Sequence, residues 1–323
     1  MSLYKKINPF SKINNDTGFA GNINDTGGRF INKNGTYNLV KVGIPFRKRF
    51  SVFHDMLNLP TWKFITLIFV FYACINIFFT ALYFISGPAQ FNGLMPGGTW
   101  KIFRQLFYFS TQTLTTVGYG HVSPIGDAVN ILAAIEALTG FLSLAIATGL
   151  IYGRFSKPKS YLVFSDNALI SPYKDGKALM FRFAPFKDKH VLTELEIKVN
   201  CGLLLIENDK PDYKYFSLEL ERTKVESLAM NWTVVHPIDE KSPFYNFTDE
   251  DMKNADAEIY VMLRGFDDVF SNFVQQRTSY TFNEILFDCK FVPMYRESDD
   301  GKKTILELHK LNAYKKVESV KGN

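Results

Sequence analysis

Several features that define common protein classes are missing from this 323-residue sequence. Only three cysteines occur, and Cys74, Cys201 and Cys289 lack the spacing of a metal site, which excludes a disulfide framework and a zinc centre. No GxGxxG segment follows residue 160, which argues against a Rossmann-type nucleotide-binding regulator. The five histidines are scattered and no nucleophile–base pair stands out, so we do not expect an enzyme.

The sequence also lacks a large excess of charge of either sign. The formal net charge is only +5, which is too small for a nucleic-acid-binding protein unless the charge is clustered. The one obvious cluster, Arg47-Lys48-Arg49, directly precedes an apolar segment, where anionic lipid is the more economical partner. No apolar segment carries arginines at every third position, which excludes a voltage sensor.

Long apolar runs are confined to the chain before about residue 155, and the mean hydropathy of −0.05 hides this segregation. Residues 64–85 carry no charge and, at about 1.5 Å per residue, span a ~30 Å hydrocarbon core. A second run, residues 130–152, contains one acid, Glu136. Between them, residues 100–114 are apolar but too short to span, which predicts a re-entrant helix surrounded by protein.

The distribution of basic residues predicts the orientation of this hairpin. The loop between the two spanning runs has only Lys101 and Arg104. Basic residues are concentrated instead at the outer ends of the runs, at Arg47, Lys48, Arg49, Lys63, Arg154, Lys157 and Lys159. Because cytoplasmic flanks carry the excess of Lys and Arg, both termini are predicted to be cytoplasmic.

Composition divides the chain into five segments. Residues 1–45, rich in Asn, Gly, Asp and Lys, are predicted to be a partly mobile cytoplasmic segment. Residues 46–59 place apolar side chains on one helical face, which predicts a helix in the membrane interface; an ordinary amphipathic core helix is the alternative. Residues 60–156 form the predicted pore domain, 157–310 a cytoplasmic β-domain and 311–323 a tail.

Short β-like runs separated by turn residues fill the chain after residue 160. Turn signals occur at 174–176 and 207–209, and one short helix is predicted at 248–254, with Thr248 as its cap. Seven or more short strands in about 150 residues predict a β-sandwich. The predicted strands are residues 161–164, 179–183, 195–199, 203–206, 232–235, 259–263 and 290–292.

The segment Thr115-Thr116-Val117-Gly118-Tyr119-Gly120 lies between the two spanning runs. A dehydrated K⁺ ion needs a cage of oxygens in place of water, and four copies of Thr-Val-Gly-Tyr-Gly form that cage in potassium channels, an established signature. The two glycines permit backbone conformations that turn successive carbonyls the same way. An accidental Gly-Tyr-Gly turn is the alternative, and the flanking helices disfavour it. The chain is therefore predicted to supply one quarter of a potassium-selective pore.

Five segments, in this order, resemble inward-rectifier potassium channels, particularly the bacterial members. The resemblance implies a homotetramer in a bacterial inner membrane, with one filter strand per subunit over an immunoglobulin-like cytoplasmic sandwich that extends the pore. It implies no nucleic-acid partner. The segments are residues 29–35 (RFINKNG), 110–120 (pore helix and filter), 154–159 (RFSKPK), 232–243 (WTVVHPID, then SP) and 276–280 (QRTSY).

The resemblance also assigns the ion ligands. Backbone carbonyls of Thr116, Val117, Gly118 and Tyr119 are expected to hold K⁺, with the Thr116 hydroxyl closing the inner end and the Tyr119 ring acting as a scaffold. We expect K⁺ ions in the filter and no organic cofactor.

Three further residues lie around the filter. Gln112 stands behind it where the family usually has Glu, so it keeps hydrogen bonding but loses any ion pair. Glu136, an acid in a span, must face the bundle, water or a partner, and we expect it near the pore helix and filter. His121, just outside the filter, is either an outer-mouth pH sensor or an inert exposed histidine.

Gating and block are assigned by position. Tyr152 falls where the family has an aromatic constriction that gates by dewetting, with an interfacial belt tyrosine as the alternative. Leu144 stands where strong rectifiers have a cavity acid, and leucine cannot attract Mg²⁺ or polyamines, which predicts weak rectification. Glu194 resembles an acid of the cytoplasmic pore that could partly replace it, with a solvated surface glutamate as the alternative.

Basic residues at the membrane exit match lipid-binding positions of the family. Arg154, Lys157 and Lys159 are expected to bind anionic headgroups together with the cluster at 47–49, although ordinary positive-inside flanking explains them too. Further basic residues are missing after Lys159, which favours bulk anionic lipid over phosphoinositide. A membrane-anchored ligand-binding sensor module is the alternative function, and it leaves the filter unexplained.

Overall fold

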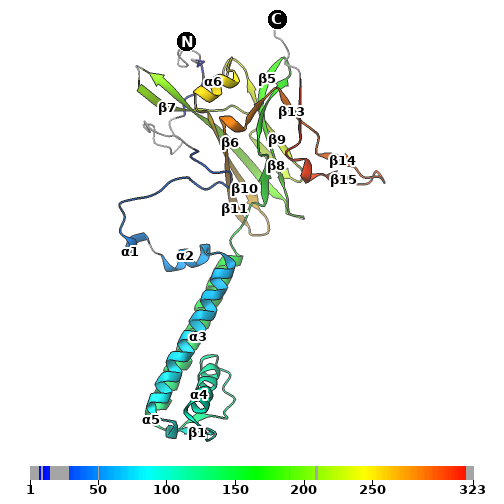
Figure 1. Cartoon of the computed structure of the whole chain (residues 1–323). Coiled ribbons are helices and arrows are strands. Elements are labelled where there is room, and N and C mark those ends of the chain that lie inside the picture. The colour runs from blue at the N-terminus through cyan, green and yellow to red at the C-terminus, as the bar shows by residue number, and fades with distance from the viewer. Residues whose placement is uncertain are drawn as a thin grey trace. The chain divides into compact units, whose positions relative to one another are not determined.

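The computed structural model describes residues 7–8, 10–14, 29–49, 51–188, 190–207 and 210–317. The chain divides into two compact units, a pore unit of Val42–Lys157 and a sandwich unit of Met1–Lys41 with Pro158–Asn323 (Figure 1). Much of the segment predicted to be mobile, the end of the predicted tail and the side chain of Arg47 lie outside the described residues.

Two long helices dominate the pore unit. Helices α3 (Thr61–Ser86, 26 residues) and α5 (Asp127–Phe155, 29 residues) are long and apolar enough to cross a membrane. The chain itself buries only 17% and 11% of their most apolar windows. The shorter α4 (Thr99–Leu114) lies between them in the sequence and contacts both. The structure therefore has the two predicted spans and the predicted pore helix.

The predicted interfacial helix over residues 46–59 is two helices, α1 (Phe46–Arg49) and α2 (Val52–Asn58). Ser51 is extended at the N-cap position of α2, with φ −123°, and its N–H donates to Oδ2 of Asp55 (3.1 Å). The extended backbone of Ser51 precedes the helix that begins at Val52, and a location of residues 46–59 in the membrane interface stays a prediction.

A small core holds the pore unit together. Strand β1 (Phe91–Asn92), which follows η2 (Pro88–Gln90), pairs antiparallel with β2 (Ser123–Pro124) and joins the loops on either side of α4 and the filter. The core packs α4 against its two long neighbours but leaves much apolar surface outside. Its buried members are Phe79, Tyr83, Phe91, Leu106, Phe109 and Val129.

Two five-stranded sheets form the sandwich unit (Figure 1). One has the order β11-β10-β6-β7 with β8 beside β6, and the other has β12-β4-β5-β3 with β9 beside β5. Two small ladders, β13–β16 and β14–β15, follow near the C-terminus. The elements are β3 (Leu162–Phe164), β4 (Ala168–Tyr173), β5 (Gly176–Pro185), β6 (Leu192–Glu207), β7 (Lys210–Ser217), β8 (Lys224–Leu228), β9 (Trp232–Ile238), α6 (Asp249–Asn254), β10 (Glu258–Asp267), β11 (Asn272–Thr281), η3 (Phe282–Glu284), β12 (Ile285–Phe287), β13 (Cys289–Phe291), β14 (Tyr295–Glu297), β15 (Thr304–Leu306), η4 (Leu308–Lys310) and β16 (Tyr314–Lys316).

Strand β6 corrects the prediction of two separate strands at 195–199 and 203–206. Gly202, between them, stays in the ladder opposite Glu258 and Tyr215. A Cβ here would lie 3.1 Å from the ring of Tyr215 and 3.2 Å from that of Tyr260. The glycine makes room for two aromatic rings and does not end the strand.

Two other local signals of the sandwich unit are confirmed, whereas most of the turn predicted at 207–209 lies outside the described residues. The turn predicted at 174–176 joins β4 to β5, with Tyr173 opposite Gly176. Helix α6 begins after Thr248, whose hydroxyl accepts from the N–H of Asp251 while the Asp251 carboxylate accepts from the N–H of Thr248. This reciprocal pair is a capping box, which satisfies two donors at the helix start.

Residues 29–35, one of the segments that carry the resemblance, lie against the sandwich. Nε of Arg29 donates to Oγ of Ser279 (3.0 Å), and its guanidinium pairs with Glu284. A Cβ on Gly35, where φ is +81°, would lie 2.6 Å from the carbonyl oxygen of Arg277. Only glycine allows the segment to approach β11 this closely.

Candidate ion-conduction pathway

The segment after α4 has an alternating backbone. Thr116 (φ +61°), Gly118 (+53°) and Gly120 (+81°) are left-handed, whereas Val117 and Tyr119 between them are not. Glycine adopts this region freely, but a threonine there is strained by about 1–2 kcal/mol. Alternation of this kind allows successive carbonyls to turn toward the same side of the strand.

The last turn of α4 holds this strand in place. The carbonyl oxygen of Gln112 accepts from the N–H groups of Val117 (2.9 Å) and Gly118 (3.3 Å). The N–H of Thr116 donates to the Thr113 carbonyl (3.0 Å). Carbonyls at a helix C-terminus have no partner inside the helix and are free to accept such bonds. Gln112 therefore contacts the segment predicted to be the filter through its main chain, whereas the sequence pointed to its side-chain amide.

Gly140 permits a close approach between α5 and the end of α4. A Cβ at this position would lie 1.9 Å from the carbonyl oxygen of Leu114, the residue before the filter. No other residue fits without moving the pore helix or the inner helix. Sequence reasoning missed Gly140, although a glycine inside a spanning helix was the available signal.

Glu136 joins the three long elements of the pore unit. Its side chain is fully buried, and its two carboxylate oxygens accept from the hydroxyls of Ser110 on α4 (2.5 Å) and Tyr83 on α3 (2.6 Å). Ser110 also lies 3.2 Å from Oδ1 of Asn76 on α3. The ring of Tyr83 packs edge-on against Phe109 at 5.2 Å. Glu136 thus lies beside the pore helix, as the sequence suggested, and its described partners are hydroxyls.

Other predicted pathway residues stand apart from this network. In the single chain, Leu144 and Tyr152 on α5 are 67% and 73% exposed, and Val117 and Tyr119 are also exposed. His121 is exposed. Its carbonyl oxygen would lie 1.7 Å from a Cβ at Gly93, so position 93 requires glycine. The structure brings residues 115–118 against the end of α4, and Leu144 and Tyr152 lie apart from them on α5.

Two family models cover most of the chain. The model for the inward rectifier potassium channel C-terminal domain matches residues 162–322, and an ion channel model matches residues 61–157. Inward rectifier potassium channel Kirbac3.1 of Paramagnetospirillum magnetotacticum is 32% identical over 283 residues, which cover 86% of this chain and 92% of that channel. The chain belongs to the inward-rectifier potassium channel family.

Further relatives are inward rectifiers too. G protein-activated inward rectifier potassium channel 1 of Bos taurus and that of Homo sapiens are each 31% identical over 206 residues, covering 59% of this chain and 40% of theirs. The solved sporulation control protein Spo0M of Bacillus subtilis aligns with a TM-score of 0.22 at 8% identity, over 39% of this chain and 47% of its own, too weakly to indicate a shared fold. Family membership and two apolar helices place this chain in a membrane.

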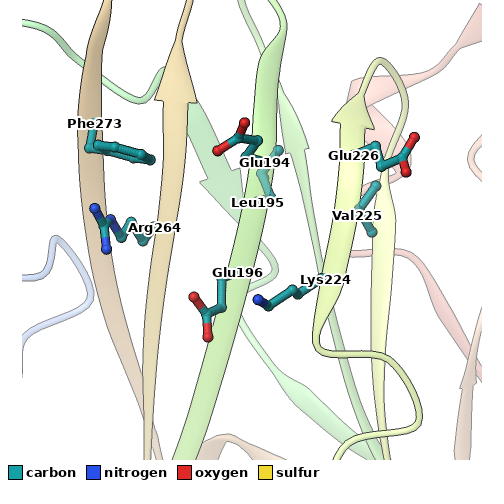
Figure 2. A pocket seen from close by; sticks show the side chains of 8 residues that line it. All are labelled: Glu194, Leu195, Glu196, Lys224, Val225, Glu226, Arg264 and Phe273. Carbon is teal, nitrogen blue, oxygen red and sulfur yellow. The ribbon is translucent and has the colours of Figure 1, made fainter.

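In this inward rectifier, Glu194 lines a surface hollow of about 550 Å³ in the sandwich unit (Figure 2). Glu194 has φ +48° and lies where the pairing of β6 with β10 shifts register. The acids of the hollow are accompanied by two cations, Lys224 and Arg264. The Arg264 guanidinium lies 3.9 Å above the ring of Phe273. Sequence reasoning singled out Glu194 alone and missed the cations, which weaken its attraction for other cations.

The basic residues at the inner end of α5 differ in their surroundings. Arg154 donates to main-chain carbonyls of the pore unit, and Lys157 donates to Oδ1 of Asn58 (2.9 Å). Lys48 and Lys159 are exposed. Lys157 is exposed as well, so of these four residues only Arg154 is partly buried.

Proposed function

We propose that four copies of this chain form a K⁺-selective channel with residues 115–120 as its filter. The observation that carries the proposal is the left-handed backbone at Thr116, Gly118 and Gly120, directly after a helix whose last carbonyls anchor the strand. The carbonyls of residues 116–119 would replace the water around K⁺, and the Thr116 hydroxyl would close the inner end. K⁺ is the transported substrate, and no organic cofactor is needed for passive conduction.

The tetramer follows from the geometry of a single subunit. One re-entrant hairpin cannot surround an ion on an axis, so a ring of identical subunits is required. Large apolar side chains on α3 and α5 are exposed in the single chain, Phe69 at 67% and Phe141 at 63%. Neighbouring subunits and lipid would cover this surface.

Gate and rectification are assigned on the inner helix. Four Tyr152 rings, one per subunit, would close an apolar constriction that gates by dewetting. Leu144 in the cavity offers no charge to Mg²⁺ or polyamines, and Glu194 has Lys224 and Arg264 beside it. We therefore infer weak rectification, with the cytoplasmic sandwich and lipid setting the state of the gate.

Topology and lipid control follow from the basic flanks. In a bacterial inner membrane, both ends of the hairpin would face the cytoplasm. Exposed Lys48 and Lys159 would attract anionic headgroups, at about 1 kcal/mol for each basic group near the surface. Phosphoinositide is not required by this arrangement.

The test is ⁸⁶Rb⁺ uptake by purified protein in liposomes with and without anionic lipid. We expect a K⁺ gradient to drive ⁸⁶Rb⁺ uptake and a Na⁺ gradient not to drive it. We also expect the amount of uptake to change when anionic lipid is included. Empty liposomes are the control. Absence of uptake under every lipid condition would contradict the channel and favour a non-conducting, membrane-anchored sensor module.

A further inference from the structure

A segment near the N-terminus extends one of the two sheets. Strand β7 is the last in the order β11-β10-β6-β7, so β6 takes only one of its two sides (Figure 1). On the other side, the N–H of Asn14 donates to the Tyr215 carbonyl (2.8 Å), and the N–H of Ser217 donates to the Lys12 carbonyl (3.0 Å). Residues 7–14, which we call the cover, therefore add a short antiparallel pairing to the open side of β7.

Side chains fasten the cover to both sheets. Nδ2 of Asn14 reaches Oδ1 of Asn200 on β6 (2.9 Å). The Asn8 side chain, only 8% exposed, donates to the main-chain carbonyl of Glu240, which follows β9 of the other sheet. Ile7 packs against the core between the sheets. The cover is thus held by main-chain, amide and apolar contacts together.

The two halves of β7 differ in how readily another strand can pair with them. The first half begins with Lys210, Pro211 and Asp212. Charges and a proline without an N–H discourage a further strand at a sheet edge. The second half, residues 215–217 (YFS), has no charge and begins with two aromatic residues that favour strands. The cover pairs with this second half, which lacks protection of its own.

The second half of β7 is also self-complementary. In the cover, the acceptor is residue Lys12 and the donor is Asn14, two residues later. In β7, the acceptor is Tyr215 and the donor is Ser217, again two residues later. A second copy of β7, turned antiparallel about Phe216, would therefore present the same two groups at the same spacing as the cover does. Such a contact is isologous, because each copy uses the same residues.

We propose that the second half of β7 is a strand-addition site, and that the cover occupies it and excludes β7 of a second copy. Main-chain hydrogen bonds at an open sheet edge are a common means of protein association. The cover is a poor template for further pairing, because it is short and its Lys12 side chain is exposed. The inference goes beyond the proposed channel function and does not depend on conduction.

The test is the protein mass of detergent-solubilised full-length chain, measured by light scattering after size-exclusion chromatography. Asn14→Pro removes the N–H that donates to Tyr215. We expect its mass to rise with concentration to at least about twice that of the natural chain, because pairing of two edges joins two assemblies. Ile13→Pro is the matched control, since the bonds to β7 come from its two neighbours, and it should keep the natural mass.

A double variant separates edge pairing from misfolding. Ser217→Pro removes the outward N–H of β7, so Asn14→Pro with Ser217→Pro should return to the natural mass. A mass that stays high in the double variant overturns the proposal, because the association then does not use this edge. A natural mass in Asn14→Pro, or a raised mass in Ile13→Pro, overturns it as well.

Hydrogen exchange of the Ser217 N–H in dilute samples reports directly whether the cover is in place. We expect faster exchange in Asn14→Pro and no change in Ile13→Pro. A synthetic peptide of residues 7–14 should reverse both the exchange and the mass of Asn14→Pro at about 1 mM, because a tethered segment has an effective concentration on the order of millimolar. Faster exchange without a rise in mass, or a raised mass that the peptide does not lower, overturns the proposal.

Discussion

In the sandwich unit a large cluster of apolar side chains lies between two sheets, whereas in the pore unit α3 and α5 leave many of theirs outside. Phe181 and Phe183 on β5 are at most 1% exposed, but Phe69 and Phe141 on the long helices are 67% and 63% exposed. The sandwich has a complete core within one chain. The pore unit has a smaller one, so its exposed apolar surface needs cover from lipid and, in the proposed tetramer, from neighbouring subunits.

Both units bury ionisable groups among neutral partners, and one from each can be compared. In the pore unit, the Glu136 carboxylate accepts from two hydroxyls. In the sandwich unit, the Arg182 guanidinium donates to main-chain carbonyls and lies 4.3 Å from the ring centre of Phe291. Burial lowers the pKa of Arg182 to about 10, so it stays charged at neutral pH. The carbonyls belong to Val292, Lys310, Leu311 and Ala313.

The largest effect is expected where backbone conformation carries function. Gly118→Ala places a Cβ at φ +53°, at a cost of roughly 1–2 kcal/mol in each subunit, and should abolish K⁺-selective uptake. The matched control is Gly176→Ala in the sandwich unit, where no atom lies within 4 Å of the added Cβ and φ is not left-handed. It should conduct normally. An unchanged K⁺/Na⁺ flux ratio in Gly118→Ala would contradict the assignment of residues 115–120 as the filter.

A second change tests packing in the pore unit. Gly140→Ala drives a Cβ against the Leu114 carbonyl and should lower the stability of the assembly by about 3 kcal/mol and reduce uptake. In Gly149→Ala the Cβ meets no atom within 4 Å, and the better helix propensity of alanine should leave stability equal or higher. Thermal dissociation of the assembly measures both. Equal losses in the two variants would contradict the close approach at Gly140.

Breaking the buried cation should affect the sandwich unit alone. Arg182→Met leaves several buried carbonyls without a donor, for a loss of about 3 kcal/mol. Limited proteolysis should then cut near the β13–β16 ladder, whereas the K⁺/Na⁺ flux ratio should be unchanged. A changed K⁺/Na⁺ flux ratio, with resistance to proteolysis unchanged, would contradict the expectation that Arg182 matters to the sandwich unit alone.

Breaking the buried acid should affect the pore unit alone. Glu136→Leu removes the acceptor of the Tyr83 hydroxyl and leaves Ser110 with only its longer contacts to Asn76, for a loss of about 2 kcal/mol in thermal dissociation and weaker support of the proposed filter. Glu136→Gln keeps an acceptor oxygen and should lose less. If the two variants behave alike, the hydrogen bonds are not what holds the three helices.

The smallest effect is a pH dependence in the sandwich unit. Burial lowers the pKa of His236 below its ordinary value of 6.5, and its ring nitrogens contact the Glu219 carbonyl (2.6 Å) and the Ser242 hydroxyl (2.8 Å). As pH falls through 6.5, the unfolded chain binds a proton that the folded one does not, so stability is fully present above 6.5 and falls below it. Tm should drop between pH 7.5 and 5.5, and less so in His236→Gln. An equal drop in the variant assigns the dependence to another group.

Local patterns account for the parts of the fold that were predicted. A spanning helix follows from the length of an apolar run, and the helix after Thr248 from a residue type that caps helices. Glycine was harder to interpret, because its meaning depends on its neighbours. Gly202 continues a strand beneath two tyrosine rings, and Gly140 admits the Leu114 carbonyl. In both cases the residues that contact the glycine are distant from it in the sequence.

By itself, the sequence determined the two spans, the filter motif between them, the β-rich second half and the family, because each depends on composition, periodicity or a contiguous motif. Only the tertiary structure decided what the isolated charges do. Ser110 is 26 residues from Glu136, and Leu311 is 129 residues from Arg182. A charged group in a dry interior must find partners, and folding alone brings residues so far apart in the chain within hydrogen-bonding distance.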